Sequence, residues 1–154
     1  MLTEKRAFIE NKFIPLLRSA DPSTTPKWGR MNFQQMVEHF VLVMKNSNGK
    51  MKVEMKTPAD KIPAFQEFIM SDKAFRENTK SPAFPEEPLP LHFASVEEAI
   101  GKLEKEVKDF FDVYEATPGL KISNPVFGDL DYEHALTLLY KHARHHLDQF
   151  GLLN

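Results

Sequence analysis

The sequence predicts an all-α protein, a four-helix bundle with an additional short helix and a proline-rich loop. Apolar residues recur at spacings of three and four in several long stretches, and a residue suited to N-terminal capping precedes three of them. No two segments alternate well enough to pair as strands of a sheet. Amphipathic helices without a sheet bury their apolar stripes most simply against one another, which favours a bundle.

Length and composition predict a single domain over residues 1–154. Hydrophobic residues make up 42% of the chain and include thirteen phenylalanines, enough for a sizeable core. Twenty basic and twenty-two acidic residues are interspersed and leave a net charge of −2, which argues against nucleic-acid and membrane partners. The chain has no cysteine, so imidazole and carboxylate are the candidate metal ligands. The N-terminus lacks a signal-peptide pattern and the longest apolar run, residues 40–44, is short, so we expect a cytoplasmic protein.

The first two helices are predicted over residues 2–18 and from Asn32 onward. The first stretch has apolar residues at helical spacing, and we expect Pro15 to end or kink it. Residues 19–27 contain two prolines among serine and threonine, which predicts a loop. Asn32 can cap the second helix, whose apolar pattern stops at the Asn-Ser-Asn-Gly run of residues 46–49.

The middle of the chain has a less regular pattern. Residues 51–55 could form a short strand, but a connecting turn is favoured because no comparable partner strand exists. A short helix is predicted over residues 61–75, beginning near Pro63. Residues 81–90 contain four prolines, which excludes a regular helix or a central strand and predicts a loop.

Two long helices are predicted in the C-terminal part. Ser95 and Glu98 have the pattern of a capping box, and the apolar rhythm that follows continues until a Pro-Gly pair ends it. Residues 121–130 are predicted to be a loop. Asp131 can cap the final helix.

This final helix carries the candidate metal ligands, because it holds four of the six histidines. His142 and His146 are four residues apart, which puts both side chains on one face of a helix, about 40° apart around its axis. With Leu139 at the centre of the apolar stripe, His146 lies inside the stripe and His142 lies on its rim. The pair can share one metal ion, or the rings can hydrogen bond to each other, to carbonyl groups or to water. Some partner is required, because an unpaired buried ring nitrogen costs about 1–3 kcal/mol.

His39 is the candidate third ligand. It flanks the apolar stripe of the second helix, where a histidine is either a hydrogen-bonded boundary residue or a ligand. Sites in helix bundles are assembled from side chains on facing helices, so His39 can meet His142 and His146.

The remaining histidines and aromatic residues have less specific positions. His145 lies further round the last helix, where it could be an alternative ligand or a rim or interface residue. His134 and His92 are expected to be solvated or structural. Trp28, just before the second helix, is either a packing residue or part of a ligand-binding surface. Two further aromatic side chains are expected in the core or in a cleft wall: Phe127 and Tyr140.

Three motifs resemble those of the DinB/YfiT-like metal-binding four-helix bundles, and together they span most of the chain. Residues 28–39 (WGRMNFQQMVEH) are similar to that family's tryptophan-containing start of helix two with the first histidine ligand. Residues 124–128 (NPVFG) and 142–149 (HARHHLDQ) are similar to its loop and to its closing H-x-x-x-H signature. The resemblance is closest to a bacterial branch with a Trp-Gly-x-Met opening. It implies a divalent ion held by His39, His142 and His146, and relatives commonly form homodimers.

The predicted function is that of a metal-dependent enzyme acting on a small-molecule substrate. Three neutral imidazoles suit zinc, nickel or ferrous iron and leave a position for water or substrate. The reaction would be either thiol S-transfer with a low-molecular-weight thiol, as the resemblance implies for some relatives, or a hydrolysis. A hydrolase would also need a carboxylate base, and Glu38 points about 100° away from His39, so no catalytic residue is assigned.

Two other functions are compatible with the sequence. The first is a non-catalytic bundle that binds a metal or a small ligand, in a structural role or in a stress response. The second is a structural dimer in which the histidines hold no metal.

Overall fold

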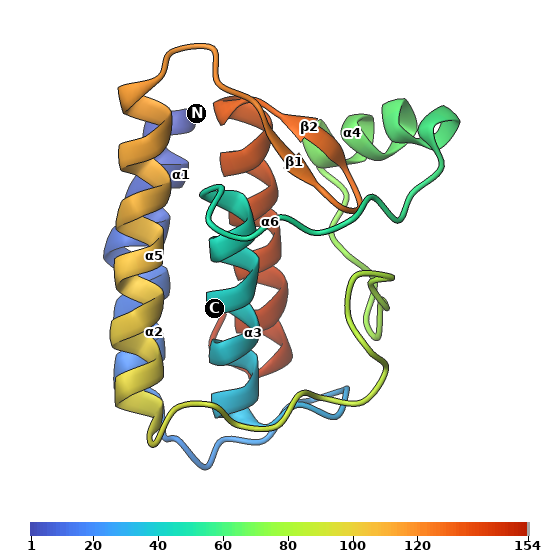
Figure 1. Ribbon diagram of the computed structural model, residues 1–154. Coiled ribbons are helices and arrows are strands. Elements are labelled where there is room, and N and C mark those ends of the chain that lie inside the picture. The colour runs from blue at the N-terminus through green and yellow to red at the C-terminus, as the bar shows by residue number, and fades with distance from the viewer. Residues whose placement is uncertain (154) are drawn as a thin grey trace.

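Four helical segments form the bundle in the computed structural model, which describes residues 1–153 (Figure 1). The first segment runs through α1 (Leu2–Phe8), a π-helical turn (Ile9–Phe13) and α2 (Ile14–Ser19). The other three are α3 (Phe33–Ser47), α5 (Val96–Ala116) and α6 (Tyr132–Gln149). The prediction of a mostly helical bundle is confirmed.

The apolar stripes of these segments face one shared core. The segment from α1 to α2 packs on both α5 and α6, and α3 packs on α5. Their buried residues belong to a single hydrophobic cluster. Its largest fully buried side chains are phenylalanines from three different segments: Phe13, Phe33, Phe40, Phe110 and Phe111. This shared core fixes α3 and α6, the two helices that carry the candidate ligands.

Pro15 does not end the first helix, contrary to one of the two outcomes expected from the sequence. The chain remains helical to Ser19, with Pro15 in the first turn of α2 and the π-helical turn directly before it. Proline has no N–H, and its ring displaces the carbonyl group of the preceding turn. A π-helical turn inserts an extra residue into that turn, so the backbone accommodates the ring without leaving the helix.

The predicted helix caps are present, with one difference. Asn32 Oδ1 accepts a hydrogen bond from the Gln35 N–H at 2.8 Å, and Gln35 Oε1 accepts one from the Asn32 N–H at 2.8 Å, so the complete capping box is at α3. Ser95 Oγ accepts from the Glu98 N–H at 3.1 Å. The sequence also predicted that the Glu98 side chain accepts from the Ser95 N–H, but the described residues show no such hydrogen bond. Asp131 caps α6 as predicted.

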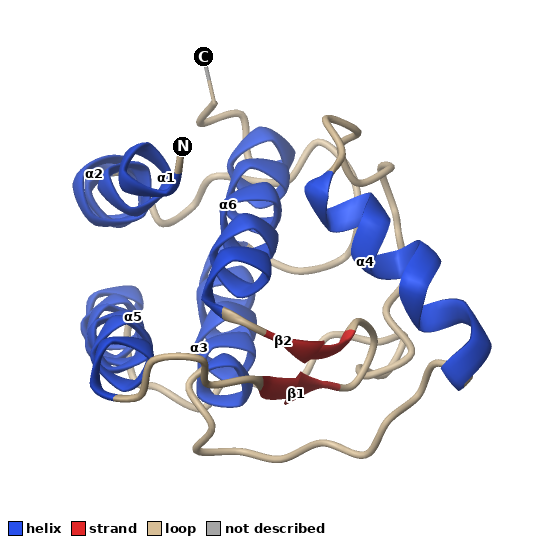
Figure 2. Ribbon diagram, turned by 90° about the horizontal axis from the view of Figure 1, so that it is seen from above, coloured by secondary structure: helices blue, strands red, loops and turns tan. Residues whose placement is uncertain are grey.

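The additional short helix lies beside the bundle. It is α4 (Ile62–Met70), preceded by a 3-10 turn (Ala59–Lys61), and it packs against α6 (Figure 2). The helix ends five residues earlier than the predicted 61–75, so Phe75 belongs to the segment that follows. Residues 51–55 form no strand and belong to the connection between α3 and α4, but they contain no turn.

Residues 121–130, predicted to be a loop, contain a small antiparallel hairpin instead. Strand β1 (Ile122–Asn124) pairs with β2 (Gly128–Leu130). Within the turn, Asn124 Oδ1 accepts hydrogen bonds from the N–H groups of Val126 and Phe127 at 2.8 and 3.0 Å. An asparagine side chain that binds the backbone in this way replaces a main-chain turn contact. The prediction was wrong because three-residue strands are too short to show alternation.

The hairpin docks against α4 through a close backbone approach. Gly128 has φ of +80°, and a Cβ atom at this position would lie 2.8 Å from Ile62 Cγ2. Gln66 Nε2 donates to the carbonyl groups of Phe127 and Asp129 at 2.9 and 3.1 Å. The NPVFG motif therefore has a structural role, which is to hold α4 beside the last helix.

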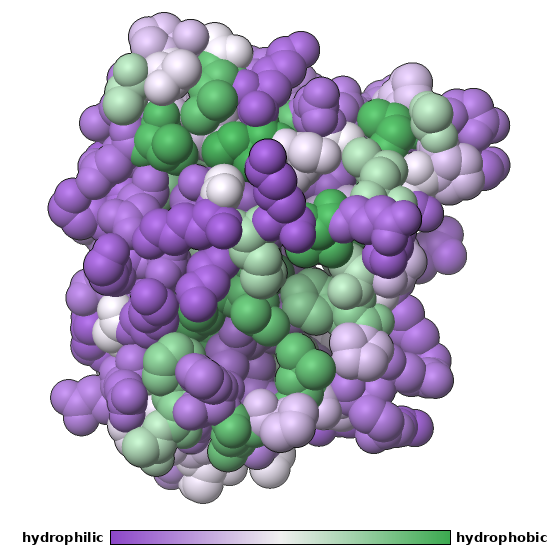
Figure 3. Space-filling model, viewed as in Figure 1, coloured by the Kyte–Doolittle hydropathy of each residue, from purple (hydrophilic) through white to green (hydrophobic). Residues whose placement is uncertain are grey.

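A long irregular segment returns the chain from α4 to α5 along the bundle (Figure 1). It includes the predicted proline-rich loop, and residues 81–90 contain neither helix nor strand. Figure 3 shows the same side of the molecule as Figure 1. Hydrophobic side chains reach the surface in the middle of this side, and hydrophilic side chains surround them. None of the helices in residues 1–153 combines the length and the hydropathy needed to cross a membrane.

Candidate metal centre

Three imidazoles from two helices meet at one side of the core. One ring nitrogen each from His39 on α3 and His142 and His146 on α6 lies within 4.8 Å of the other two. His142 Nε2 is 2.8 Å from His146 Nε2 and 3.3 Å from His39 Nε2. The sequence predicted that these three residues approach one another, and the structure brings them together.

A buried phenylalanine supports the cluster from the core side. The Phe40 ring is 4.7 Å from the His142 ring and 5.3 Å from the His146 ring, centroid to centroid. Phe40 is fully buried and follows His39 directly in α3. The packing of α3 into the core therefore also sets the position of His39 opposite α6.

Gln149 fixes the tautomer of His146. Its Nε2 donates to the Trp28 carbonyl oxygen at 2.9 Å, and because a carbonyl group can only accept, the amide is oriented with Oε1 toward the imidazole. Oε1 lies 2.7 Å from His146 Nδ1, so Nδ1 carries the proton and Nε2 presents its lone pair to the cluster. An outer partner of this kind is the usual support of a metal-binding histidine.

Gly29 allows the contact between Gln149 and Trp28. It has φ of +85°, and a Cβ atom there would lie 2.8 Å from Gln149 Nε2. The Lys27 N–H also donates to the Gln149 carbonyl oxygen at 2.7 Å. One structural unit is therefore formed by the Trp-Gly pair that begins the motif of residues 28–39 and the glutamine that ends the motif of residues 142–149.

Burial keeps all three imidazoles neutral at pH 7. It lowers the pKa of His39 to about 4, with a smaller contribution from His145. Burial, with the neighbouring imidazoles, lowers the pKa of His142 well below its ordinary value. Burial and His39 have the same effect on the pKa of His146, against an opposing hydrogen bond to Gln149. Neutral imidazole is the form that coordinates a metal.

Hydrogen bonds alone satisfy this cluster poorly. His142 Nε2 carries either one proton or one lone pair, directed along the ring plane, yet it has two nitrogen neighbours in different helices. His146 Nε2 can only accept, because its ring proton is on Nδ1. A cation between the three atoms would satisfy all three lone pairs at once.

Aromatic side chains cover the outer side of the imidazoles. The Phe84 ring is 4.7 Å from the His39 ring, and the Phe75 ring is 5.8 Å from the His142 ring. Both belong to the segment between α4 and α5. Sequence reasoning did not associate either residue with the site, because Phe75 was placed in a helix and Phe84 in a proline-rich loop.

The other histidines lie outside the group of three. His145 packs between Trp28 and Phe75, each 5.6 Å away, as a rim residue, and burial lowers its pKa. His134 Nδ1 is 2.9 Å from the Asp131 carboxylate at the start of α6. His92 is exposed. His145 is thus a rim residue rather than an alternative ligand, and His134 and His92 are structural and solvated, respectively, as expected.

The remaining candidates are accounted for by packing and by backbone contacts. The Tyr140 ring packs against Phe8, 5.0 Å away, and the Phe127 ring packs against Phe65 at 6.0 Å. Glu38 accepts hydrogen bonds from the backbone N–H groups of His92 and Phe93 at 2.7 and 3.1 Å. Glu38 is therefore committed to the backbone and does not serve the imidazoles, as its helix position predicted.

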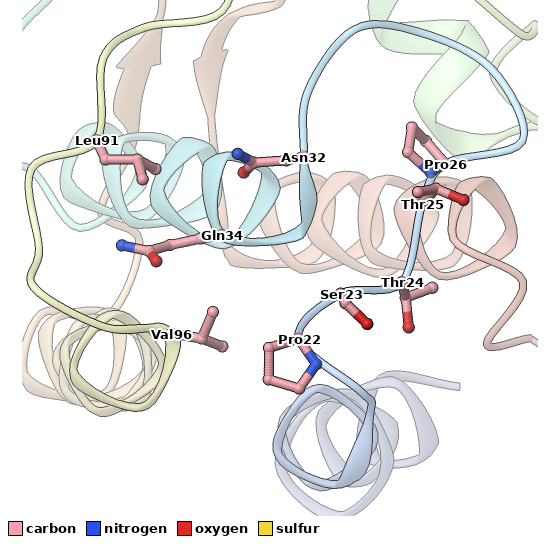
Figure 4. Close-up of a pocket in the computed structure, with 9 residues that line it drawn as sticks. All are labelled: Pro22, Ser23, Thr24, Thr25, Pro26, Asn32, Gln34, Leu91 and Val96. Carbon is pink, nitrogen blue, oxygen red and sulfur yellow. The ribbon is translucent and has the colours of Figure 1, made fainter.

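A surface cavity of about 290 Å³ lies at another part of the bundle and carries no comparable chemistry (Figure 4). None of its nine lining residues is ionisable. Its two amide side chains are already used, because Asn32 caps α3 and Gln34 Nε2 donates to the Phe93 carbonyl oxygen at 2.8 Å. The imidazole cluster remains the candidate functional site.

A helical bundle with three convergent, neutral imidazoles defines the class of a candidate metal-binding protein. The sequence model of the DinB superfamily matches residues 14–150, and the chain belongs to that superfamily, whose members are in general metal-binding. No curated protein and no solved structure gives a significant match.

Proposed function

We propose that the protein is a metal-dependent enzyme whose divalent ion is held by His39, His142 and His146. The observation that supports this is the convergence of three ring nitrogens from α3 and α6 within 4.8 Å of one another. Zinc, nickel and ferrous iron all suit an all-imidazole site.

The geometry of the residues fits such an ion. Ligands at 2.0–2.1 Å from a tetrahedral zinc ion are separated by roughly 3.3 Å. His39 and His142 match this spacing at 3.3 Å, His142 and His146 are closer to each other at 2.8 Å, and all three nitrogens lie within 4.8 Å of one another. The Gln149 contact leaves the His146 lone pair directed to the centre.

Three protein ligands favour an enzyme over a structural site. Structural zinc sites are usually closed by four protein ligands, whereas catalytic sites have three and an open position. Among residues 1–153 the group consists of three histidines and no carboxylate. The open position would be available to a substrate group.

Within this class, the surroundings favour thiol S-transfer over hydrolysis. A divalent ion at this site would supply Lewis acidity, which would favour the thiolate form of a low-molecular-weight thiol. The three histidines would hold the ion as neutral ligands, and Gln149 orients His146. Hydrolysis would need a base near the attacking water, and Glu38 is engaged with the backbone of residues 92 and 93.

Metal analysis and a thiol assay test the proposal together. Purified protein should contain close to one equivalent of a divalent metal, and His39→Ala and His142→Ala should each contain almost none. His92→Ala is the matched control, because its side chain is exposed and lies outside the group of three imidazoles. A panel of low-molecular-weight thiols and electrophiles should show turnover that His142→Ala abolishes. Metal-free wild-type protein would contradict the metal site, and turnover unchanged in His142→Ala would contradict the transferase.

The homodimer, the cytoplasmic location and the single domain over residues 1–154 stay predictions.

A further inference from the structure

We propose that Phe75 and Phe84 determine ligand specificity at this centre, favouring ligands whose remaining part is uncharged and aromatic. Lys141 and Glu38 are positioning residues that hold these two rings over the imidazoles. This inference rests on the proposed function, since it concerns the group that would occupy the open metal position. The segment that carries both rings, residues 71–93, is called the covering segment below.

The two phenylalanines are the ring neighbours of the ligands on the outer side. Phe84 packs on His39 with a centroid separation of 4.7 Å, and Phe75 packs on His142 at 5.8 Å and on His145 at 5.6 Å. Both phenylalanines are partly exposed, unlike the fully buried Phe40 beneath the cluster. A ligand that reaches the imidazoles from the outer side would therefore contact these two rings.

The surroundings of the imidazoles disfavour a second charge. Phe40 packs on the core side and Phe75 and Phe84 on the outer side. The charged side chains that precede two of the ligands in sequence, Glu38 and Lys141, bind backbone groups of the chain instead. A charged group placed among the rings would lose its hydration and find no hydrogen-bond partner in these side chains, which is costly. An aromatic group would lose nothing and would gain ring contacts.

Lys141 holds the beginning of the covering segment. Its ammonium group donates to the carbonyl oxygens of Phe68 and Ser71, each at 3.0 Å, and to that of Lys73. It also lies 4.3 Å from the centre of the Phe68 ring. These contacts cap the C-terminal end of α4 and fix the chain two residues before Phe75.

Glu38 and its neighbours on α3 hold the end of the covering segment. The Glu38 carboxylate accepts from the N–H groups of His92 and Phe93, and Gln34 Nε2 donates to the Phe93 carbonyl oxygen. Gln35 Nε2 donates to the Leu89 carbonyl oxygen at 3.1 Å. The covering segment is thus fixed at both ends to the helices that carry the ligands.

Each of these two charged residues is the sequence neighbour of a candidate ligand. Lys141 precedes His142 on α6, and Glu38 precedes His39 on α3. The backbone of each helix therefore fixes an imidazole on one face and a contact to the covering segment on an adjacent face. This arrangement sets Phe75 and Phe84 at defined positions relative to the cluster.

Ligand binding to the cobalt-loaded protein tests the specificity. The visible spectrum of bound Co²⁺ would be titrated with benzyl mercaptan, 2-mercaptoethanol and 2-mercaptoethanesulfonate. We expect benzyl mercaptan to bind at least about tenfold more tightly than 2-mercaptoethanol, as burial of an aromatic group implies, and the sulfonate to bind most weakly. In Phe75→Ala and Phe84→Ala the preference for benzyl mercaptan should fall toward one. Phe65→Ala is the matched control, because Phe65 packs on Phe127 and not on an imidazole.

The outcomes separate this inference from the proposed function. Thiols that bind cobalt with equal affinities, or a preference unchanged by both alanine variants, would overturn the specificity while leaving the metal site intact. A protein that takes up no cobalt, or whose cobalt spectrum responds to no thiol, would contradict the proposed function, and the inference would fall with it.

The positioning residues are tested by the same ratio of affinities. Lys141→Met and Glu38→Gln should lower the preference for benzyl mercaptan, while cobalt stoichiometry and the spectrum of the ligand-free protein stay as in the wild type. Lys141→Arg keeps hydrogen-bond donors at this position and should restore the preference. A purely structural role would instead change the folded fraction and leave the ratio of affinities in the folded protein unchanged, which would overturn this part.

Discussion

Two groups of polar side chains in the bundle differ in how they are satisfied. Glu106 on α5 is fully buried, and its carboxylate lies 2.7 Å from Lys50 Nζ, 2.9 Å from Lys102 Nζ and 2.9 Å from Asn48 Nδ2. The protein itself supplies all of these partners. In the imidazole cluster, by contrast, three ring nitrogens face one another and no protein donor serves them all.

The two groups also differ in their charge at neutral pH, because different causes determine their pKa values. Burial alone would raise the pKa of Glu106, but the contacts with Lys102, Lys50 and Asn48 outweigh it and lower the pKa to about 2. Burial lowers the pKa of His39 to about 4, so this side chain is neutral where Glu106 is charged. A buried group matched by internal partners therefore joins parts of the fold, whereas one that lacks them is suited to bind something else.

The largest expected effect is the loss of metal-linked stability in His142→Ala. A divalent ion at a thousandfold excess over its dissociation constant should raise the free energy of unfolding of the wild type by about 4 kcal/mol. The variant should show little or no stabilisation by the same metal, measured by chemical denaturation with and without added ion. An equal stabilisation of both proteins by the metal would show that the imidazole cluster does not bind the ion, and would remove its contrast with Glu106.

Removing the carboxylate at Glu106 should have the next largest effect. Glu106→Ala leaves two lysines and Asn48 without their partner, and we expect the free energy of unfolding to fall by about 3 kcal/mol, the lower end of the range for a broken buried pair, because both lysines can reach water. Metal content should not change. A loss of metal in this variant would show that the two groups are coupled, which contradicts the separation of roles.

Gln149→Leu should weaken metal binding without removing a ligand. The variant loses the contact that fixes the His146 tautomer, and loss of such an outer contact typically costs about 10–100-fold in metal affinity. Competition with a chelating indicator would measure it. Glu133→Leu, an exposed substitution on the same helix, is the control and should bind metal as the wild type does.

The smallest effect is the loss of stability of the metal-free protein on mild acidification, to pH 5.5. His39 has a folded pKa of about 4 and an ordinary value of 6.5, so the unfolded state binds the proton first and stability falls as the pH drops from 6.5 toward 4. At pH 5.5 the loss should be about 1.4 kcal/mol for this side chain.

Glu106 acts in a lower range of pH than His39. Its stabilisation is present above pH 4.5 and is lost as the pH falls toward 2. Denaturant titrations of the wild type should show a decrease in stability that begins near pH 6.5, from the buried imidazoles, and a further decrease below pH 4.5, from Glu106. The upper decrease should be smaller in His39→Phe, and an unchanged profile in that variant would contradict the assignment.

Helix patterning and spacing predicted the bundle and the approach of the three imidazoles. The helical period of α3 and α6 determines which faces are buried, and both faces carry histidines at their edges, so packing of the apolar stripes brings the rings together. The caps at Asn32 and Asp131 were equally visible, because capping depends on local chemistry.

Features that depend on tertiary contacts were not predictable from the sequence. The hairpin is formed by strands of three residues, and the π-helical turn before Pro15 belongs to a helix held in place by the core. The contacts of Phe75 and Phe84 depend on the path of an irregular segment, which has no period to read. Gln149 was visible as a motif residue, but its role needs the carbonyl group of Trp28, which lies 121 residues away in the chain.

The position of Trp28 has a practical consequence. It is the one tryptophan of the chain, its carbonyl group binds Gln149, and its indole packs on His145. Ultraviolet excitation of the protein therefore yields emission from a single indole beside the cluster. Occupancy by a quenching ion such as Cu²⁺ or Co²⁺ should dim that emission, so the chain carries its own optical probe for following metal uptake in real time without an added label.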